Sequence, residues 1–144
     1  MQRGLAGFVG GLIGGLAMLI LDQVTFSINI SSVNSVGIMS RFLGGISPIT
    51  AWLIGILITG VVGWLVAIIF SKEFPREYVS SGLILGLILW LAMNIVFAAT
   101  GKITPTWSMG ASSLIINLIA HLVTGVVITY TLWRSKMEVV EQGK

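Results

Sequence analysis

One carboxylate lies inside a long apolar run of this sequence, where a charge is costly and therefore informative. Asp22 follows Met18, Gly15 and Gly11 by four, seven and eleven residues, a spacing that places all four on one helix face. On membrane-insertion scales, an Asp at the centre of a membrane helix costs roughly 2.5 to 3.5 kcal/mol of insertion free energy, and an Asp nearer the helix end costs less. A polar partner or water is therefore expected beside Asp22, on the inside of a bundle.

A polar stripe in the last apolar run supplies candidate partners. Ser113, Asn117, His121 and Thr124 are spaced four, four and three residues apart, so they share one helix face that should point inward. A second amide, Asn94, lies in the third apolar run. Counted from the outer ends of the helices, Asn94 and Asn117 lie about as deep as Asp22, and His121 lies one helical turn deeper. The predicted intramembrane polar cluster comprises Asp22, Asn94, Asn117, His121 and Thr124.

This polar cluster admits two functional readings. A carboxylate and an imidazole with nearby amides are the groups of proton or cation relays, which would indicate a small oligomeric transporter or channel for protons, cations or a small solute. The other reading is hydrogen bonding between helices, worth about 0.6 kcal/mol per bond. A lone Asp and a lone His are few for a coupled transporter. The leading prediction is therefore a non-enzymatic structural or accessory membrane component.

Other kinds of chemistry lack the residues they need. The sequence has no cysteine and a single histidine, so no metal site and no cofactor is predicted. It has no paired carboxylates, no nucleophile elbow and no phosphate-binding glycine loop, so no residue is assigned a catalytic role and the chain is not predicted to be an enzyme. Its lysines and arginines form no basic stripe with interleaved aromatics, which argues against nucleic acid as a partner.

Glycines recur at helical spacing in two of the apolar runs. Gly7, Gly11 and Gly15 form one stripe, and Gly82 and Gly86 repeat the pattern later in the chain. Small residues at this spacing let two helix backbones approach closely. The stripes are either a homo-oligomer interface or packing surfaces for the chain's own helices, and the second reading is favoured.

The elements that must position these residues are four apolar helices. Of the 144 residues 56% are hydrophobic and 9% are charged, with a mean hydropathy of +1.02, whereas soluble domains are usually about 25% charged. Each apolar run has the length that crosses a bilayer. The runs cover about 4–26, 49–70, 79–99 and 108–133. The predicted fold is an all-α integral membrane protein with a single domain, 1–144, built as an antiparallel bundle of four transmembrane helices in the lipid bilayer.

The connections and the charges predict how these helices are oriented. The segment from Ser27 to Pro48 is polar and then amphipathic, as is typical of a segment in the membrane interface. Lysine and arginine gather at one set of helix ends, at Arg3, Lys72, Arg76, Arg134, Lys136 and Lys144, against Arg41 and Lys102 at the other. The positive-inside rule therefore predicts that both termini are cytoplasmic. The expected location is a bacterial inner membrane.

Two pairs of helices match each other in order, which predicts an internal repeat. At an offset of 75, Leu16-Ala17-Met18 matches Leu91-Ala92-Met93. At an offset of 65, Thr59-Gly60-Val61-Val62 matches Thr124-Gly125-Val126-Val127. The repeat would be a duplicated helical hairpin, 4–70 and 79–134, with a pseudo-twofold axis along the membrane normal.

The second half of the chain carries a family resemblance. It reads Gly-x-x-x-Gly-x-x-x-Trp-Leu from Gly82 to Leu91, then Gly101, then His-Leu-Val-Thr-Gly from His121 to Gly125. This pattern resembles small four-helix bacterial membrane proteins of the YqhR and YagU type. Those families are largely uncharacterised, so the resemblance implies an inner-membrane location and supplies no substrate or catalytic residue.

Overall fold

The described part of the chain is helical and contains no strand. The computed structural model describes residues 3–69 and 77–142, with side chains placed as far as Lys136. Its elements are α1 (Arg3–Ser27), α2 (Ser35–Phe42), α3 (Pro48–Ile69), α4 (Tyr78–Thr100), the 3₁₀ turn η1 (Thr106–Ser108) and α5 (Ala111–Gln142). Three of the basic residues that predict the orientation, Lys72, Arg76 and Lys144, lie outside the described residues.

Four of these helices are long and apolar enough to cross a membrane: α1, α3, α4 and the part of α5 from Ala111 to Lys136. Large apolar side chains on them are more than half exposed, and examples are Ile49, Leu53, Ile69, Ile84 and Ile95. A water-soluble protein would bury such residues. The length of the four helices and the exposure of their apolar side chains together suggest a membrane protein.

The helix bounds follow local signals in the sequence. Pro48 opens α3, at the position where a missing backbone N–H costs nothing, and the side chain of Asn34 caps α2 by accepting from Gly37 N at 2.8 Å. Gly101, with a φ of 62°, ends α4 in the left-handed conformation that favours glycine. The last helix starts at Ala111 rather than near 108, because Thr106–Ser108 forms a 3₁₀ turn and Gly110 has a φ of 98°.

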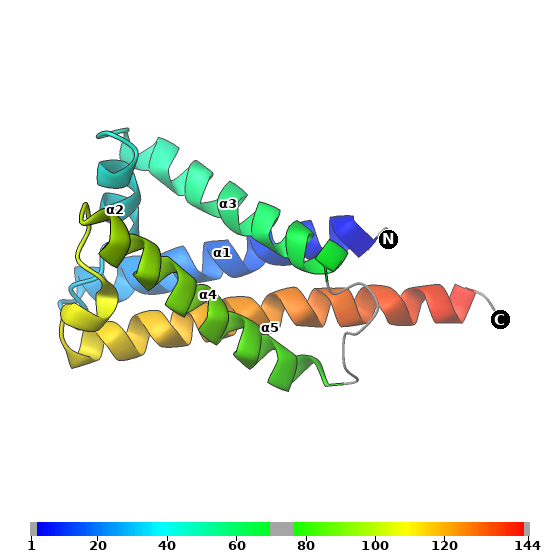
Figure 1. Ribbon diagram of the computed structural model, residues 1–144. Helices are drawn as coiled ribbons and strands as arrows, with labels where there is room; N and C mark the ends of the chain where they lie inside the picture. Colours follow the sequence, from blue (N-terminus) through cyan, green and yellow to red (C-terminus); the bar gives the residue numbers. More distant parts are fainter. Residues whose placement is uncertain (1–2, 70–76, 143–144) are drawn as a thin grey trace.

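Figure 1 shows α1 and α5 side by side along the middle of the molecule, with consecutive long helices running in opposite directions and both termini at one end. The helix α3 packs on α1, and α4 packs on α5. Among the described residues, α3 and α4 have no comparable contact with each other. The fourth interface of a closed four-helix bundle is therefore not formed here.

The α1–α3 interface is a contact between backbones. A Cβ added at Gly7 would lie 2.3 Å from Gly63 O, and one added at Gly11 would lie 2.0 Å from Thr59 O. At Gly15 it would meet the Thr59 hydroxyl. No side chain fits at these positions, so this glycine stripe packs within the chain.

The α4–α5 interface repeats this arrangement. A Cβ at Gly86 would lie 2.4 Å from His121 O, and one at Gly82 would lie 2.4 Å from Val126 Cα. From the facing helix, a Cβ at Gly125 would lie 2.1 Å from Gly82 O. The second glycine stripe therefore also packs within the chain, where small residues permit close helix contact.

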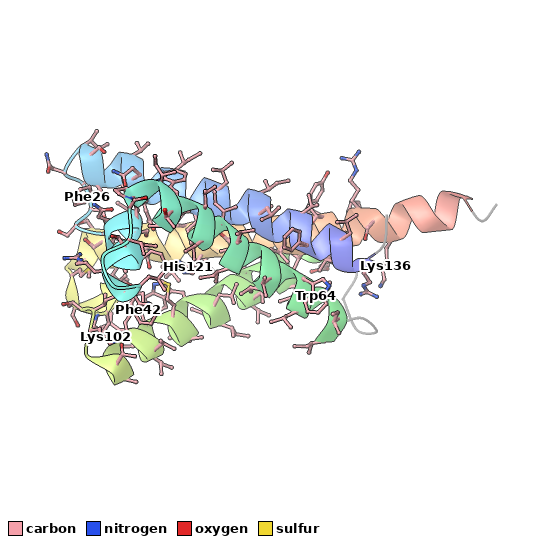
Figure 2. The ribbon with its side chains drawn as sticks, turned by 90° about the horizontal axis from the view of Figure 1, so that it is seen from above. Phe26, Phe42, Trp64, Lys102, His121 and Lys136 are labelled. Atoms are coloured by element: carbon pink, nitrogen blue, oxygen red, sulfur yellow. The ribbon has the colours of Figure 1, made fainter. Side chains whose placement is uncertain are left out.

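The short helix α2 joins the two halves at the end of the molecule away from the termini. Ile38 of α2 and the preceding Val33 are buried in one apolar cluster with Phe97 of α4 and Ile103 of the α4–α5 connection. Figure 2 shows Phe26, Phe42 and Lys102 at this end and Lys136 toward the other. The predicted amphipathic segment thus folds back onto the long helices.

Candidate functional site

Asp22 is held at the junction of three helices. Its side chain is fully buried, with 0% of its surface exposed. Its Oδ2 atom accepts a hydrogen bond from the Ser35 hydroxyl at the start of α2 and another from Asn117 Nδ2 of α5 at 3.2 Å. The carboxyl group therefore ties α1 to α2 and α5.

Two oxygen atoms of this junction keep unused hydrogen-bonding capacity. Asp22 Oδ1 and Asn117 Oδ1 are both buried, and neither accepts a hydrogen bond from the described residues. An unpaired buried polar atom costs about 1–3 kcal/mol. These two oxygens are the part of the site best placed to contact a proton or a cation.

His121 lies one turn beyond Asn117 on α5 and bonds to that turn rather than to Asp22. Its Nδ1 atom lies 2.8 Å from the backbone oxygen of Asn117. A carbonyl can only accept, so Nδ1 carries the proton and, in the neutral ring, Nε2 is the unprotonated nitrogen. No hydrogen bond within the described chain reaches Nε2 or joins His121 to Asp22.

Thr124 connects the two central helices. Its hydroxyl Oγ1 lies 3.0 Å from Gly14 O of α1 and 2.9 Å from Ala120 O of its own helix. The single proton is shared between these two carbonyls. Because a Cβ at Gly14 would lie about 3.0 Å from the Thr124 methyl group, the glycine makes room for this contact.

Asn94 is not part of the Asp22 junction and bonds to Trp90 and Thr106 instead. Its Oδ1 atom accepts from Thr106 N at 2.6 Å and from the Thr106 hydroxyl at 2.9 Å, and its Nδ2 atom donates to Trp90 O at 2.9 Å. Both residues of this pair are 0% exposed. The amide thus fixes the α4–α5 connection and makes no hydrogen bond to Asp22 or Asn117.

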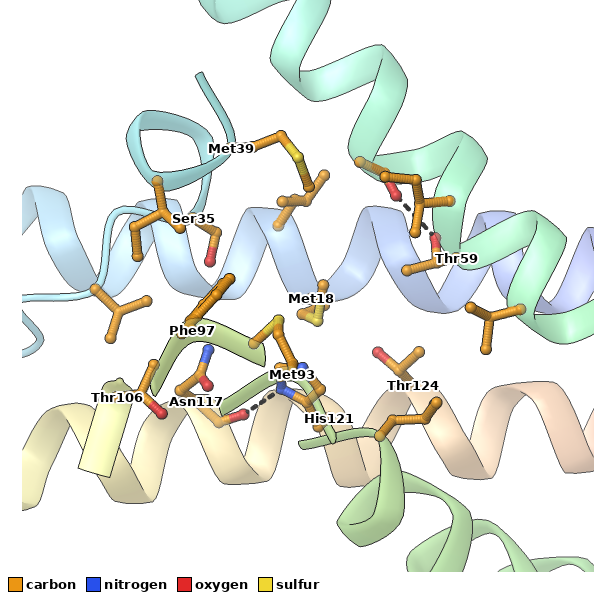
Figure 3. A pocket seen from close by; sticks show the side chains of 17 residues that line it. Met18, Ser35, Met39, Thr59, Met93, Phe97, Thr106, Asn117, His121 and Thr124 are labelled. Atoms are coloured by element: carbon orange, nitrogen blue, oxygen red, sulfur yellow. Dashed lines mark hydrogen bonds between the residues drawn. The ribbon is translucent and has the colours of Figure 1, made fainter. Parts of the chain in front are cut away.

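A partly open cavity of about 200 Å³ adjoins the polar groups. Figure 3 shows residues of all four long helices and of α2 around it. The polar residues among those that line it are Ser35, Thr59, Thr106, Asn117, His121 and Thr124. Most of the other lining residues are methionine and aliphatic residues, and Asp22 is not among the residues that line the cavity.

The sequence did not single out several residues that this site uses. Ser35 belongs to the segment that the sequence predicts in the membrane interface, and the structure shows it as a donor to Asp22. Thr106, which follows Pro105 in a short connection and has no distinctive spacing, is the partner of Asn94. Among the described residues, no group of three or more His, Cys, Asp or Glu side chains could hold a metal ion.

The fold and the site define a class: an all-helical chain with four candidate membrane spans, helices in glycine contact, and a buried Asp–Ser–Asn junction beside an apolar cavity. The chain belongs to the family described as "Family of unknown function (DUF6789)", whose model matches residues 1–139. Neither the curated proteins nor the solved structures contain a significant match. The resemblance to proteins of the YqhR and YagU type stays a prediction.

Proposed function

We propose that this protein is a non-enzymatic accessory component of a bacterial inner membrane, with α1, α3, α4 and α5 as antiparallel spans. Support for insertion comes from the exposed apolar side chains along these helices. Support for cytoplasmic termini comes from Arg3, Arg134 and Lys136 near the end with both termini, against Arg41 and Lys102 at the other. The lipid bilayer is then the first partner of the protein.

One observation favours the accessory role over catalysis or conduction: the buried polar groups are used to join helices. Asp22 and Asn117 are 0% and 1% exposed, and their hydrogen bonds join α1, α2 and α5. Acid–base catalysis would need a donor and an acceptor within reach of one substrate. His121 makes its hydrogen bond to its own helix instead. The polar groups therefore serve the architecture.

The same architecture supports a duplicated hairpin. Gly11 and Gly86 correspond at the offset of 75, and each lies against the backbone of the next long helix, α3 for Gly11 and α5 for Gly86. A strict pseudo-twofold would also pair α3 with α4 as closely as α1 is paired with α5, and the described residues lack that contact. The duplication we infer is thus one whose two halves have diverged in packing.

Both glycine stripes are occupied within the chain, so a second copy or a membrane-protein partner would have to use another surface. The outer faces of α3 and α4 are the candidates, because their large apolar side chains are exposed. An accessory component would meet its partner there, in the plane of the membrane.

A small transporter or channel is the second candidate. It is favoured by the unpaired oxygens Asp22 Oδ1 and Asn117 Oδ1 and by the cavity that reaches Asn117 and His121. An ionisable residue inside a membrane span often marks an ion pathway. In this reading, opening of the Ser35–Asp22 contact would connect the carboxyl group to the cavity.

Flux measurements in liposomes separate the two candidates. The purified protein and its Asp22→Asn and His121→Ala variants are compared with protein-free liposomes for proton and cation flux. Ser135→Ala is the matched control, because this buried hydroxyl bonds only to Leu132 O of its own helix. The accessory role predicts no flux above the protein-free level in any sample. Flux that is lost in both site variants and kept in the control would overturn it and establish the transporter.

A further inference from the structure

Methionine side chains gather around the cavity between the long helices. Three of the six methionines line it, Met18 from α1, Met39 from α2 and Met93 from α4. The only histidine of the chain, His121, lines it from α5. In Figure 3 Met18 and Met93 lie between α1 and α5 near His121, and Met39 enters from the side of α2. Three thioethers and one imidazole thus share one small space.

Two of these methionines are equivalent in the repeat. Met18 and Met93 are 75 residues apart, the same offset that relates the glycine stripes of α1 and α4. Thr59 and Thr124, which correspond at the offset of 65, also line the cavity. The cavity therefore lies where the two repeats meet, the place where membrane proteins with internal repeats commonly hold a substrate or an ion.

One ring nitrogen of His121 is hydrogen-bonded and the other is available to bind an ion. Its Nδ1 atom is fixed by the backbone oxygen of Asn117 at 2.8 Å, which leaves Nε2 as the atom with a free lone pair. No hydrogen bond from the described residues occupies Nε2, although the side chain is only 5% exposed. Histidines that bind metals usually donate their other ring N–H to a carbonyl or carboxylate in this way.

The donor set selects the kind of ion. Thioether sulfur and neutral imidazole are soft, uncharged ligands, and thioethers select Cu(I) among the biological metals. Among the described residues, no carboxylate, lysine or arginine side chain is part of the lining. Hard ions such as Mg²⁺ and Ca²⁺ need several oxygen ligands, and Zn²⁺ sites use thiolate, imidazole or carboxylate ligands. A soft monovalent cation is the match with the least charge to bury.

We propose that this cavity is a Cu(I)-binding site, with His121 Nε2 and the sulfur atoms of Met18 and Met93 as ligands and Met39 as an additional sulfur donor. Methionine side chains are flexible and fill irregular spaces, so small rotations bring the sulfurs to the ion. The site goes beyond the accessory role, because an accessory component and a transporter could each hold the ion at this position.

Anaerobic titration of the purified full-length protein in detergent tests the proposal. Cu(I) is offered in competition with a chromophoric Cu(I) chelator, and the expected result is one ion bound per chain. X-ray absorption of that sample should show sulfur and nitrogen around the copper. Zn²⁺ in excess should not displace it. Absence of bound copper, or a copper surrounded by oxygen and nitrogen alone, would overturn the site.

Variants then locate the ion. Met18→Leu combined with Met93→Leu, and separately His121→Ala, should weaken Cu(I) binding by roughly tenfold or more, since loss of even an outer partner of a metal ligand costs that much. Leu and Met have similar volumes, so the double variant should fold. Met109→Leu is the matched control, because Met109 packs in the apolar cluster with Phe97 and not in the cavity lining. Equal binding by all four proteins would place the copper elsewhere and refute the site.

Discussion

The backbone contact between α1 and α3 makes Gly11→Ala a sharp test of the fold. The added Cβ would lie 2.0 Å from Thr59 O and 2.8 Å from Gly60 Cα, both well under the 3.4 Å at which ordinary contact begins. Both neighbours are backbone atoms, so relief requires the two helices to move apart. Overpacking of this kind costs about 1–3 kcal/mol.

A second glycine on the same interface supplies the control. At Gly55 an added Cβ would lie 3.3 Å from Leu19 Cδ1, the end of a side chain that can rotate. Alanine favours a helix over glycine by up to about 1 kcal/mol, and both variants share that gain. The difference between their free energies of unfolding should therefore equal the overpacking cost, about 1–3 kcal/mol, with Gly11→Ala the less stable.

The assay is reversible unfolding in detergent micelles, followed by far-ultraviolet circular dichroism and compared between the two variants. Gly55→Ala should unfold at the same denaturant concentration as the parent or slightly later. Equal stability of Gly11→Ala and Gly55→Ala would refute the reasoning, because α1 and α3 could then not be in backbone contact at Thr59.

Three further changes test other parts of the molecule. Asn94→Ala leaves the buried Thr106 N–H unpaired and should cost about 1–3 kcal/mol in the same unfolding assay, whereas Thr106→Ser keeps both donors and should cost less. Asp22→Asn keeps an acceptor oxygen and should unfold close to the parent, whereas Asp22→Leu should be clearly less stable. In this cysteine-free chain, Lys136→Cys and Lys102→Cys should react with an impermeant thiol reagent from the cytoplasmic and opposite sides respectively, and labelling from one side alone would contradict the proposed orientation.

The long helices could be predicted from the sequence because their signals are local. Runs of about 20 apolar residues define a span wherever they occur, and Pro48 and Gly101 mark a helix start and a helix end by their own backbone constraints. The start of α5 could not be placed in this way. Thr106 is held in its 3₁₀ turn by Asn94, which lies 12 residues earlier and on another helix.

The polar cluster was predictable in part, for the same physical reason. The spacing of Asn117, His121 and Thr124 places them on one buried face of α5, but the spacing says nothing about rotation between helices. That rotation turns Asn94 toward the α4–α5 connection and leaves Asp22 with Ser35 as a donor. Ser35 gives no signal of its own, since its partner is chosen by how α2 folds back onto α1.

Divergence between the repeats explains why the polar groups occur singly. At the offset of 75 the counterpart of Asp22 is Phe97, and at the offset of 65 the counterpart of His121 is Ile56. Met18 and Met93, by contrast, remain a matched pair in the wall of the cavity.

A symmetric pair of thioethers with a single imidazole gives three soft donors without a second ionisable group to bury, which is a low cost for a site inside a membrane. A histidine at the repeat counterpart of His121, Ile56→His, would place a polar ring at a partly exposed position outside the cavity lining. It should therefore lower the stability of the protein in the membrane and leave the affinity for Cu(I) unchanged.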